Sequence, residues 1–444
     1  MDTAALLRLR DEVSGDVVLP GDERYGDLAR LIVHTGRPAA VVRCRSTADV
    51  VAAVRSARDQ GLEISVRSGG HSNAGYSTNV DGLVIDLTEM NAVEVLDPER
   101  RLVRLGAGAR WAQVAAALAP HGLSITSGDT ASVGVGGLLV GGGIGWMVRR
   151  YGLAIDNVVG AELVTADGSV LRADARENPE LFWALRGGSG NFGVVTSFEV
   201  RACRVSRVFF GTLYFRPGQT PAVLRAMTRY MRTAVPELTT SVKMFPTFGA
   251  EAPPLMVLVC YAGEDAEAAA RAIDPIRGFG DLVDDDVSLR TYGDILAVID
   301  PLPPGWQPRV RNRFAPALPE PCLDAVVRHH GLFSTLFVEI RYLGGAMARV
   351  PAHATAFAHR DAEAMIMGVL LGSPQDNEPL LPRYEEFWQE LAPYTRGAYT
   401  GFLSDLLPAD LDAAFPEPAR SRLVEVKRRY DAQNTFHLNP NIAP

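Results

Sequence analysis

The feature that most constrains this chain is an uncharged, glycine-rich stretch over residues 130–148, TASVGVGGLLVGGGIGWMV. Its length approaches the roughly 20 residues that a helix needs to span a bilayer, but seven of its nineteen residues are glycine. Glycine costs about 0.5–1 kcal/mol relative to alanine inside a helix, whereas it allows a backbone to approach another group closely. We therefore predict a backbone that winds around a partner, and no membrane span.

The rest of the composition is typical of a folded, water-soluble chain of two or three domains. Of its 444 residues, 47% are apolar and 22% are charged, and the net charge of −8 comes without any Lys/Arg-rich run, so no nucleic-acid partner is expected. The N-terminus lacks an apolar segment long enough for a secretory signal, which predicts a cytoplasmic protein. The wide spacing of the four cysteines indicates neither a zinc site nor a disulfide framework, and we expect them to be buried thiols: Cys44, Cys203, Cys260 and Cys322.

The N-terminal part alternates strand and helix patterns. Residues 39–44 form a predicted strand, Ser46 is a predicted helix N-cap, and residues 62–66 form the next predicted strand. This second strand runs directly into residues 67–72, a loop of mostly small side chains. Open α/β sheets bind ligands at the carboxyl ends of their strands, so this loop is a candidate ligand site.

The pattern changes near residue 204, where glycine clusters give way to longer elements. Predicted strands span 208–215, 241–248, 255–261, 336–342 and 365–371, and predicted helices span 221–234, 266–276 and 376–390. A further helix over 419–429 precedes an asparagine-rich C-terminal segment. The chain is therefore expected to be of the α+β class, with one domain up to about residue 203 and a second α+β layer after it.

Two glycine clusters qualify as phosphate-binding loops, where a side chain would hold backbone N–H groups away from an anion. The P-loop pattern is absent, and G-x-G-x-x-G occurs once, at Gly188, Gly190 and Gly193, between a predicted helix and a strand. Dinucleotide binding needs the reverse order of elements, which leaves the clusters at 69–71 and 128–145. Two such loops suit an FAD-sized ligand held at its pyrophosphate, although the pattern alone does not distinguish FAD from another nucleotide.

Five segments in order resemble the berberine-bridge-enzyme-like FAD-linked oxidases, a branch of the vanillyl-alcohol-oxidase superfamily with PCMH-type FAD-binding domains. They are RSGGHS at 67–72, VGVGG at 133–137 with GGG at 141–143, RYGL at 150–153, LFWALRGG at 181–188 with NFGVVT at 191–196, and YD at 430–431 with Asn434 and Phe436. The likeness covers nearly the whole chain and is densest over residues 36–203.

This resemblance implies the domain organisation and the cofactor. It implies a two-part PCMH-type FAD-binding domain over 1–203, with its core at about 36–203, and a substrate-binding domain over 204–403 with an antiparallel sheet covered by helices. The segment 404–444 would return to the FAD domain.

The resemblance also implies how the flavin is held. In the family, the histidine of the glycine-glycine-histidine motif is bonded to the 8α carbon of FAD, and this role falls on His71. Some members have a second tether through a cysteine, but the matching residue here is Thr130, so a single link is expected. The residues expected to contact FAD are Arg67, Ser68, Gly69, Gly70, His71, Ser72, Gly128, Thr130, Val133, Gly134, Gly136, Gly137, Gly141, Gly142, Val195, Asn439 and Asn441.

The base that takes the substrate's heteroatom proton comes from the second domain in this family, and its identity varies. On the predicted strand that ends at Tyr342, alternation puts Glu339 and Arg341 on one face and Tyr342 on the other. Two charges on one face of an apolar strand indicate a cleft. Tyr399 matches a family tyrosine that is followed two residues later by asparagine, where this chain has Gly401. Tyr399, Glu339 and Tyr342 are the candidates for base or substrate contact.

The leading hypothesis is an oxidase in specialised metabolism. Hydride would pass from an alcohol, amine or ring C–H of a small molecule to flavin N5, and O2 would reoxidise the flavin to give H2O2. The alternative is a flavoprotein that binds and sequesters a redox-active small molecule and needs no competent base. A cofactor-free binding or structural protein would leave the glycine clusters without a role. The substrate and the oligomeric state, monomer or homodimer, stay open.

Overall fold

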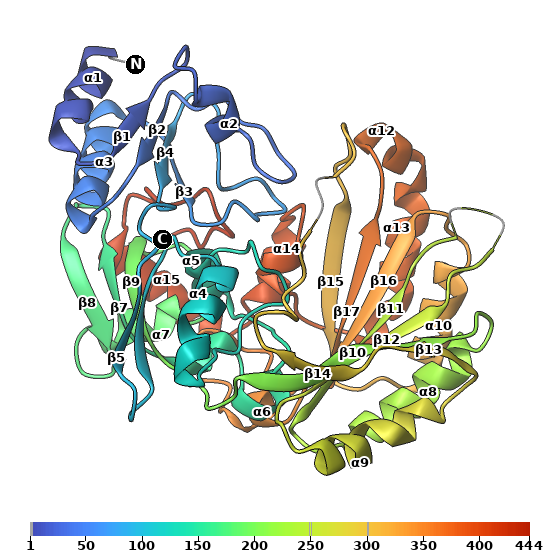
Figure 1. Cartoon of the computed structure of the whole chain (residues 1–444). Helices are drawn as coiled ribbons and strands as arrows, with labels where there is room; N and C mark the ends of the chain where they lie inside the picture. The colour runs from blue at the N-terminus through green and yellow to red at the C-terminus, as the bar shows by residue number, and fades with distance from the viewer. Residues whose placement is uncertain (1–2, 248, 250, 300–301) are drawn as a thin grey trace.

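The structure, a computed structural model, describes residues 3–247, 249, 251–299 and 302–444. In this part of the chain the strands form a four-stranded, a five-stranded and an eight-stranded sheet. Figure 1 shows the two smaller sheets in the N-terminal part of the molecule, in blue to green, and the large sheet in a second part beside them. This arrangement confirms the predicted α+β class.

The four-stranded sheet carries the first predicted ligand loop. Its strands are ordered β1-β2-β4-β3, and β2, β4 and β3 are parallel. The predicted β-α-β unit is present, because α3 begins after Ser46, whose side chain accepts a hydrogen bond from Asp49 N, and ends at Gly61 in the left-handed region. Its elements are β1 (Asp16–Val18), β2 (Ala40–Arg43), α3 (Thr47–Gln60), β3 (Ile64–Arg67) and β4 (Leu83–Asp86). The loop after β3 therefore leaves the carboxyl end of a parallel strand.

The five-stranded sheet is antiparallel, with the order β5-β6-β9-β7-β8. Its strands are β5 (Val93–Asp97), β6 (Leu102–Gly106), β7 (Val158–Val164), β8 (Val170–Asp174) and β9 (Val194–Arg201). The helices connected with it are α4 (Trp111–Leu118), α5 (Val135–Gly141) and α7 (Pro179–Leu185). One apolar core joins this sheet to the four-stranded sheet, to α7 and to the C-terminal residues Phe436 and Ile442.

The eight-stranded sheet confirms the predicted antiparallel sheet covered by helices. Its order is β13-β10-β12-β11-β16-β17-β15, with β14 paired to β10. The strands are β10 (Arg207–Phe215), β11 (Leu238–Met244), β12 (Leu255–Tyr261), β13 (Leu282–Asp285), β14 (Ser288–Thr291), β15 (Arg309–Ala315), β16 (Leu336–Tyr342) and β17 (Ala364–Leu370). The covering helices are α8 (Thr220–Met231), α9 (Ala266–Arg277), α10 (Glu320–His330) and α13 (Leu381–Leu391). Their apolar residues form a second core on one face, while the other face turns toward the N-terminal part (Figure 1).

Several predicted elements have different bounds in the structure. The predicted strand 241–248 is β11 and ends at Met244, and residue 248 lies outside the described residues. The predicted helix 376–390 is divided into α12 (Pro374–Asn377), a 3-10 turn (Glu378–Leu380) and α13, because prolines at 379 and 382 interrupt backbone hydrogen bonding. Strands β1, β8, β13, β14 and β15 have no counterpart among the predictions.

The remaining helices lie at the ends and at the junction of the two parts. They are α1 (Thr3–Glu12), α2 (Tyr25–Ala29), α6 (Val148–Tyr151), α11 (Ala346–Arg349), α14 (Pro408–Ala414) and α15 (Ala419–Tyr430). Further 3-10 turns span Ala119–His121, Ala154–Asn157, Ala392–Tyr394 and Thr400–Phe402. Helix α15 packs against α7, so the end of the chain lies on the N-terminal part, and we propose the domain division 1–203, 204–403 and 404–444 on this basis.

The glycine-rich stretch 130–148 contains only the seven-residue helix α5 and the first residue of α6. Among the described residues, no helix has both the length and the apolar character that crossing a membrane requires.

Candidate active site

The loop after β3 packs directly against the first turn of α5. The Ser68 hydroxyl donates to Ala107 O at 2.6 Å and accepts from Gly136 N at 3.2 Å. A Cβ atom at Gly69 would lie 2.3 Å from Gly134 N, and one at Gly134 would lie 2.1 Å from Ser68 Oγ. Glycine is required at these two positions because two protein segments meet, which differs from the predicted reason of close approach to a ligand.

Open space adjoins this contact at Gly70 and Gly137. Gly70 has φ +72°, and a Cβ there would meet only a methyl group of Leu31, at 3.4 Å. Gly137 is exposed, and a Cβ there would meet nothing within 4 Å among the described residues. Gly142 faces the Tyr399 ring instead, since its Cβ would lie 3.0 Å from Tyr399 Cε2. Of the predicted glycine-rich binding surface, the part at Gly70 and Gly137 is thus open, and Tyr399 bounds it on one side. We call this open surface the glycine floor.

His71 follows Gly70 beside the glycine floor. Its Nε2 lies 2.9 Å from Ser132 Oγ, and its Nδ1 has no hydrogen bond within the described part of the chain. Burial, and next the positive charge of Arg110, lower the pKa of His71 to about 4. The imidazole is therefore uncharged at neutral pH, and in the tautomer whose Nε2–H donates to Ser132, Nδ1 presents a lone pair.

Arg67 and Ser72 hold the two ends of this loop. Arg67 is 5% exposed, and its Nη1 lies 3.4 Å from Asp86 Oδ2, while its Nε donates to Ser77 O at 3.3 Å. Ser72 Oγ accepts from Tyr76 N at 3.2 Å. The second terminal nitrogen of Arg67, Nη2, is buried and has no acceptor among the described residues.

The C-terminal segment reaches this region by docking on the loop 187–193. The buried Asn191 side chain donates to Pro440 O at 3.0 Å and accepts from Ile442 N at 2.9 Å. The loop is bonded in turn to α5, because the backbone N–H groups at 187 and 189 both donate to Val140 O. The structure thus brings α5, the loop 187–193 and the predicted C-terminal residues to one place.

Several buried polar atoms in this region lack a protein partner. Asn439 donates to Gly190 O at 3.2 Å, but Oδ1 of Asn439 and Oδ1 of Asn441 are buried without a hydrogen-bond donor in the described part of the chain. Buried polar groups are normally hydrogen-bonded, so these atoms and Arg67 Nη2 indicate a polar ligand that completes the site. Together with the glycine floor and the uncharged His71, they fit FAD.

Four other predicted flavin contacts occupy more enclosed positions. Thr130 is 7% exposed, and its hydroxyl donates to Asp129 Oδ1 at 3.0 Å. A Cβ at Gly128 would meet Leu138 Cδ1 at 3.1 Å. Val133 accepts a backbone hydrogen bond from Trp111 N, and Val195 lies in β9 within the first core. Their roles toward a flavin stay a prediction.

Tyr399 is held rigidly at the boundary of the glycine floor. Its phenolic oxygen accepts from Gly143 N at 3.0 Å, and its backbone N–H donates to Asn312 Oδ1 at 2.7 Å. Burial raises the pKa of Tyr399, and the Gly143 hydrogen bond and then the Arg341 charge oppose that rise. Its hydroxyl hydrogen has no acceptor among the described residues, so it can contact a substrate.

Glu339 and Arg341 lie on one face of β16, as the alternation predicts, and belong to a charge cluster. Glu339 is 2% exposed and accepts from Ser241 Oγ at 2.5 Å and from Arg341 Nη2 at 3.2 Å, and its Oε1 forms an ion pair with Arg341 Nε at 3.0 Å. Arg341 Nη2 also pairs with Asp129 Oδ2 at 2.5 Å, which links the second part of the molecule to the loop before α5. Burial acts to raise the pKa of Asp129, but Arg341 and then Lys243 outweigh it and hold the pKa below its usual value. Asp129 is missing from the predicted site, although a lone charge beside an uncharged glycine-rich stretch is a signal that could have identified it.

The prediction that Tyr342 contacts substrate or acts as a base is not supported by its position. Its side chain lies on the opposite face of β16, is fully buried in the second core beneath the helices, and bonds to Thr228 Oγ1 at 2.9 Å. Side chains alternate between the two faces of a strand, so residues an odd number of positions apart point to opposite faces. Tyr342 and Glu339 are three positions apart on β16 and therefore cannot line one cleft. Burial raises the pKa of the Tyr342 hydroxyl well above its ordinary value.

Apolar side chains continue the Glu339 face of the large sheet. Cross-strand registers place Phe337, Met367 and Val369 on that side, next to Val310 of β15. These residues form an apolar cluster, here called the cleft cluster: Val310, Met367 and Val369 with Phe337, Leu371 and Phe402 packed on them. The face is therefore charged at the β11–β16 end and apolar at the β17–β15 end.

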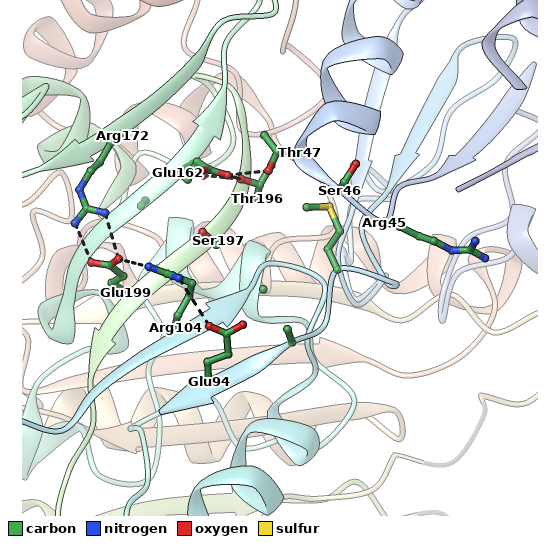
Figure 2. A pocket seen from close by; sticks show the side chains of 14 residues that line it. Arg45, Ser46, Thr47, Glu94, Arg104, Glu162, Arg172, Thr196, Ser197 and Glu199 are labelled. Carbon is green, nitrogen blue, oxygen red and sulfur yellow. Dashed lines mark hydrogen bonds and ion pairs between the residues drawn. The ribbon is translucent and has the colours of Figure 1, made fainter. Parts of the chain in front are cut away.

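A separate groove of about 430 Å³ lies where the two smaller sheets meet, and none of the predicted flavin residues lines it. Figure 2 shows Arg104 and Arg172 pointing at Glu199, with the closest N–O distances 3.1 and 2.8 Å. Glu162 accepts hydrogen bonds from the hydroxyls of Thr47 and of a second threonine, both at 2.7 Å. These charged side chains are paired with one another, so the groove carries no indication of a missing ligand.

Comparisons with known proteins agree with this geometry. Residues 38–174 match a family model described as an FAD binding domain, and residues 418–443 match one described as berberine and berberine like. (R)-6-hydroxynicotine oxidase of Paenarthrobacter nicotinovorans is 34% identical over 459 residues, covering 97% of this chain and 97% of that protein. The crystal structure of 6-hydroxy-D-nicotine oxidase from Arthrobacter nicotinovorans gives a TM-score of 0.86 at 31% identity, covering 97% of this chain and 98% of the other. Glucooligosaccharide oxidase of Acremonium strictum, with its 6-S-cysteinyl, 8α-N1-histidyl FAD, shares the fold at 23% identity, with a TM-score of 0.84 and coverage of 100% and 99%.

Proposed function

This chain belongs to the berberine-like FAD-linked oxidoreductases and is an FAD-dependent oxidase of that family, and on this premise we propose that it oxidises a small molecule with a flavin bonded covalently to His71. When bound, FAD supplies hydride acceptance from a substrate carbon and passes the electron pair to O2, giving H2O2. The substrate class proposed is an alcohol, an amine or a ring C–H compound of specialised metabolism. The uncharged His71 imidazole beside the glycine floor is the observation that carries this proposal.

His71 suits a covalent bond because its nitrogen lone pair is available. With the pKa lowered to about 4, the ring is not protonated at pH 7. Ser132 engages Nε2, which leaves Nδ1 for the 8α carbon. The backbone on both sides is anchored, by Ser68 to Ala107 and by Ser72 to the amide of Tyr76, and the ring itself is held by Ser132.

A single link is proposed because no thiol lies where a second one would be needed. Thr130 occupies the position at which a cysteinyl link would require sulfur, and its hydroxyl is bonded to Asp129. All four cysteines are buried, and burial raises the pKa of each thiol, to about 12 for Cys203 and Cys322. Thiols that stay protonated and enclosed do not react as nucleophiles.

Tyr399 is the proposed group for the substrate's heteroatom proton. Its oxygen accepts a hydrogen bond from Gly143 N, and that donor stabilises a phenolate over a phenol. Because burial still raises the pKa of Tyr399, the phenol predominates at neutral pH and the basic form increases as the pH rises. Glu339 is better placed to bind than to accept a proton, since Ser241 and Arg341 already engage its carboxylate.

The test of this proposal is the spectrum of acid-precipitated protein. Flavin absorbance should stay with the precipitated chain and be lost to the supernatant in the His71→Ala variant. A matched control is His34→Ala, because this half-buried histidine lies near the same loop, with Nε2 2.6 Å from Asn73 O, yet has no role in attachment. Free flavin released by acid from the unmodified protein would refute the covalent bond.

The alternative, a flavoprotein that sequesters a redox-active compound, shares the cofactor and differs in turnover. Anaerobic mixing with candidate substrates distinguishes the two. An oxidase loses its oxidised flavin absorbance with a true substrate and regains it when O2 is admitted, with H2O2 formed in equal amount. A sequestering protein keeps the oxidised spectrum throughout.

A further inference from the structure

Lysine is rare in this chain. Of its 44 cationic residues other than histidine, only Lys243 and Lys427 are lysine and all others are arginine. The two side chains are not equivalent, since the ammonium is compact and donates in three tetrahedral directions, whereas the guanidinium is a planar fork. Each lysine in such a chain therefore marks a candidate site that arginine could not fill.

Lys427 has such a site. It is fully buried in α15, and its Nζ donates to Asp431 Oδ2 at 2.7 Å and to the carbonyls of Asn191 and Phe436, both at 2.9 Å. Three acceptors around one nitrogen match an ammonium and leave no room for a planar fork. Lys427 thus joins the C-terminal segment to the loop 187–193.

Lys243 lies on the cleft side of the large sheet. It lies opposite Glu339 in the register of β11 and β16, and alternation puts it on the same face as Ser241. It is half-buried, and its ammonium has no hydrogen bond or ion pair within 4 Å in the described part of the chain. A half-buried cation without a partner beside the charge cluster is the unusual feature here.

The nearby carboxylates are already engaged by other groups. Asp129 is bonded to Arg341 and to the Thr130 hydroxyl, and Glu339 is bonded to Ser241 and Arg341. Lys243 acts on Asp129 only at longer range, where it helps to lower the pKa of that carboxyl. The three donor directions of the ammonium therefore stay available to a ligand.

Aromatic side chains flank Lys243 on the same face. Phe245 lies two residues further along from Lys243, and Phe337 lies two residues before Glu339, with their ring centroids 4.8 Å apart. Phe245 is 36% exposed, and Phe337 packs on the cleft cluster. A cation thus adjoins an apolar, aromatic surface that leads toward Tyr399 through Phe402.

We propose that Lys243 is a specificity-determining residue whose ammonium binds an anionic oxygen of the substrate, a carboxylate, phenolate or enolate, while the substrate's apolar body lies on the cleft cluster. This inference rests on the proposed function, since it assigns the substrate class of the same cleft. Charge-assisted hydrogen bonds are the strong ones in a partly desolvated site, so the site selects acidic aromatic compounds over neutral isosteres and over ammonium compounds.

The test compares three probes of one shape, benzoate, benzamide and benzylammonium, by titration calorimetry on the intact protein. Benzoate should bind at least about 10-fold more tightly than benzamide, because a hydrogen bond between two charged groups is stronger than one to a neutral amide. Lys243→Met should remove that preference without weakening benzamide, and Lys243→Arg should keep only part of it, because the guanidinium carries the same charge in a different geometry. Arg229→Met, an exposed cation on the helix-covered side, is the control and should change nothing.

Two outcomes overturn the inference. Equal binding of benzoate and benzamide by the unmodified protein is one, and an equal loss for both probes in Lys243→Met is the other, since that would mean the lysine only balances the charge cluster. Calorimetry does not need the flavin absorbance, so a colourless protein that still shows a Lys243-dependent preference would refute the proposed function and leave this site intact. A yellow protein without the preference would do the reverse.

Discussion

Arg341 connects the two parts of the molecule through buried charge, and replacing it by methionine should destabilise the protein strongly at pH 8. The substitution keeps most of the side-chain volume but leaves Glu339 and Asp129 without their shared cation. Removing one partner of a buried ion pair costs about 3–5 kcal/mol. The Glu339 side chain is 2% exposed and that of Asp129 is 21% exposed, so partial solvation of Asp129 favours the lower end, about 3 kcal/mol.

The size of the loss should depend on pH in a defined direction. In the folded parent the pKa of Asp129 is below its usual value, so its contribution to stability is present above the unfolded pKa of about 3.8 and is lost as pH falls through the folded pKa. In Arg341→Met, burial acts on Asp129 without its main opposing cation and raises the pKa of that carboxyl group. The destabilisation is therefore greatest at pH 8 and shrinks toward pH 5 as Asp129 takes up a proton.

Thermal unfolding of the flavin-loaded protein, followed by circular dichroism, measures this effect. A loss of 3 kcal/mol corresponds to a fall of about 6–12 °C for a domain of 150–250 residues. Adding Asp129→Asn and Glu339→Gln to Arg341→Met should recover much of the fall at pH 8. The control is Arg290→Met, whose partner Asp286 has a side chain that is 47% exposed, so loss of this ion pair should lower the free energy of unfolding by about 1 kcal/mol or less. A fall below 2 °C at pH 8, or the same fall at pH 5, would refute the reasoning.

Three further predictions concern the glycine floor, His71 and Tyr399. Gly69→Ala should prevent correct folding of the loop, because its Cβ would lie 2.3 Å from Gly134 N. Gly137→Ala should fold normally but bind less flavin, because its Cβ would enter the open space. Equal flavin content in both soluble variants would contradict the assigned geometry. Added FAD should attach to flavin-free protein at the same rate from pH 8 to pH 5 and more slowly toward pH 4, because the pKa of His71 is lowered to about 4. An attachment rate that halves near pH 6.5 argues against an uncharged, buried ring. Tyr399→Phe should keep its flavin but slow anaerobic flavin reduction by about 10²–10⁴-fold, the usual contribution of a general base. In the parent the raised pKa of Tyr399 implies a reduction rate that rises between pH 7 and pH 10, and the variant should lose that rise. A variant that retains this pH dependence excludes Tyr399 as the base.

Much of the site's location could be predicted from local patterns. The loop 67–72 follows a parallel strand, and β16 spans the predicted residues 336–342 with the predicted alternation. Such features depend on backbone periodicity and turn chemistry, which neighbouring residues specify. Edge strands such as β13 and β14 are short and partly exposed, so they lack the apolar alternation that makes a strand recognisable in sequence.

By itself, the sequence determined which segments must be glycine-rich, where the histidine-bearing loop leaves its strand, and which side chains share a face of β16. Only the tertiary structure decided that Asp129, Ser241 and Lys243 join Glu339 and Arg341, and that helices cover the face that carries Tyr342. Alternation divides a strand into two faces, but packing against other elements decides which face meets a helix and which meets a cleft. That choice depends on contacts between residues more than 200 positions apart in the chain, as Arg341 and Asp129 are, and no local pattern encodes them.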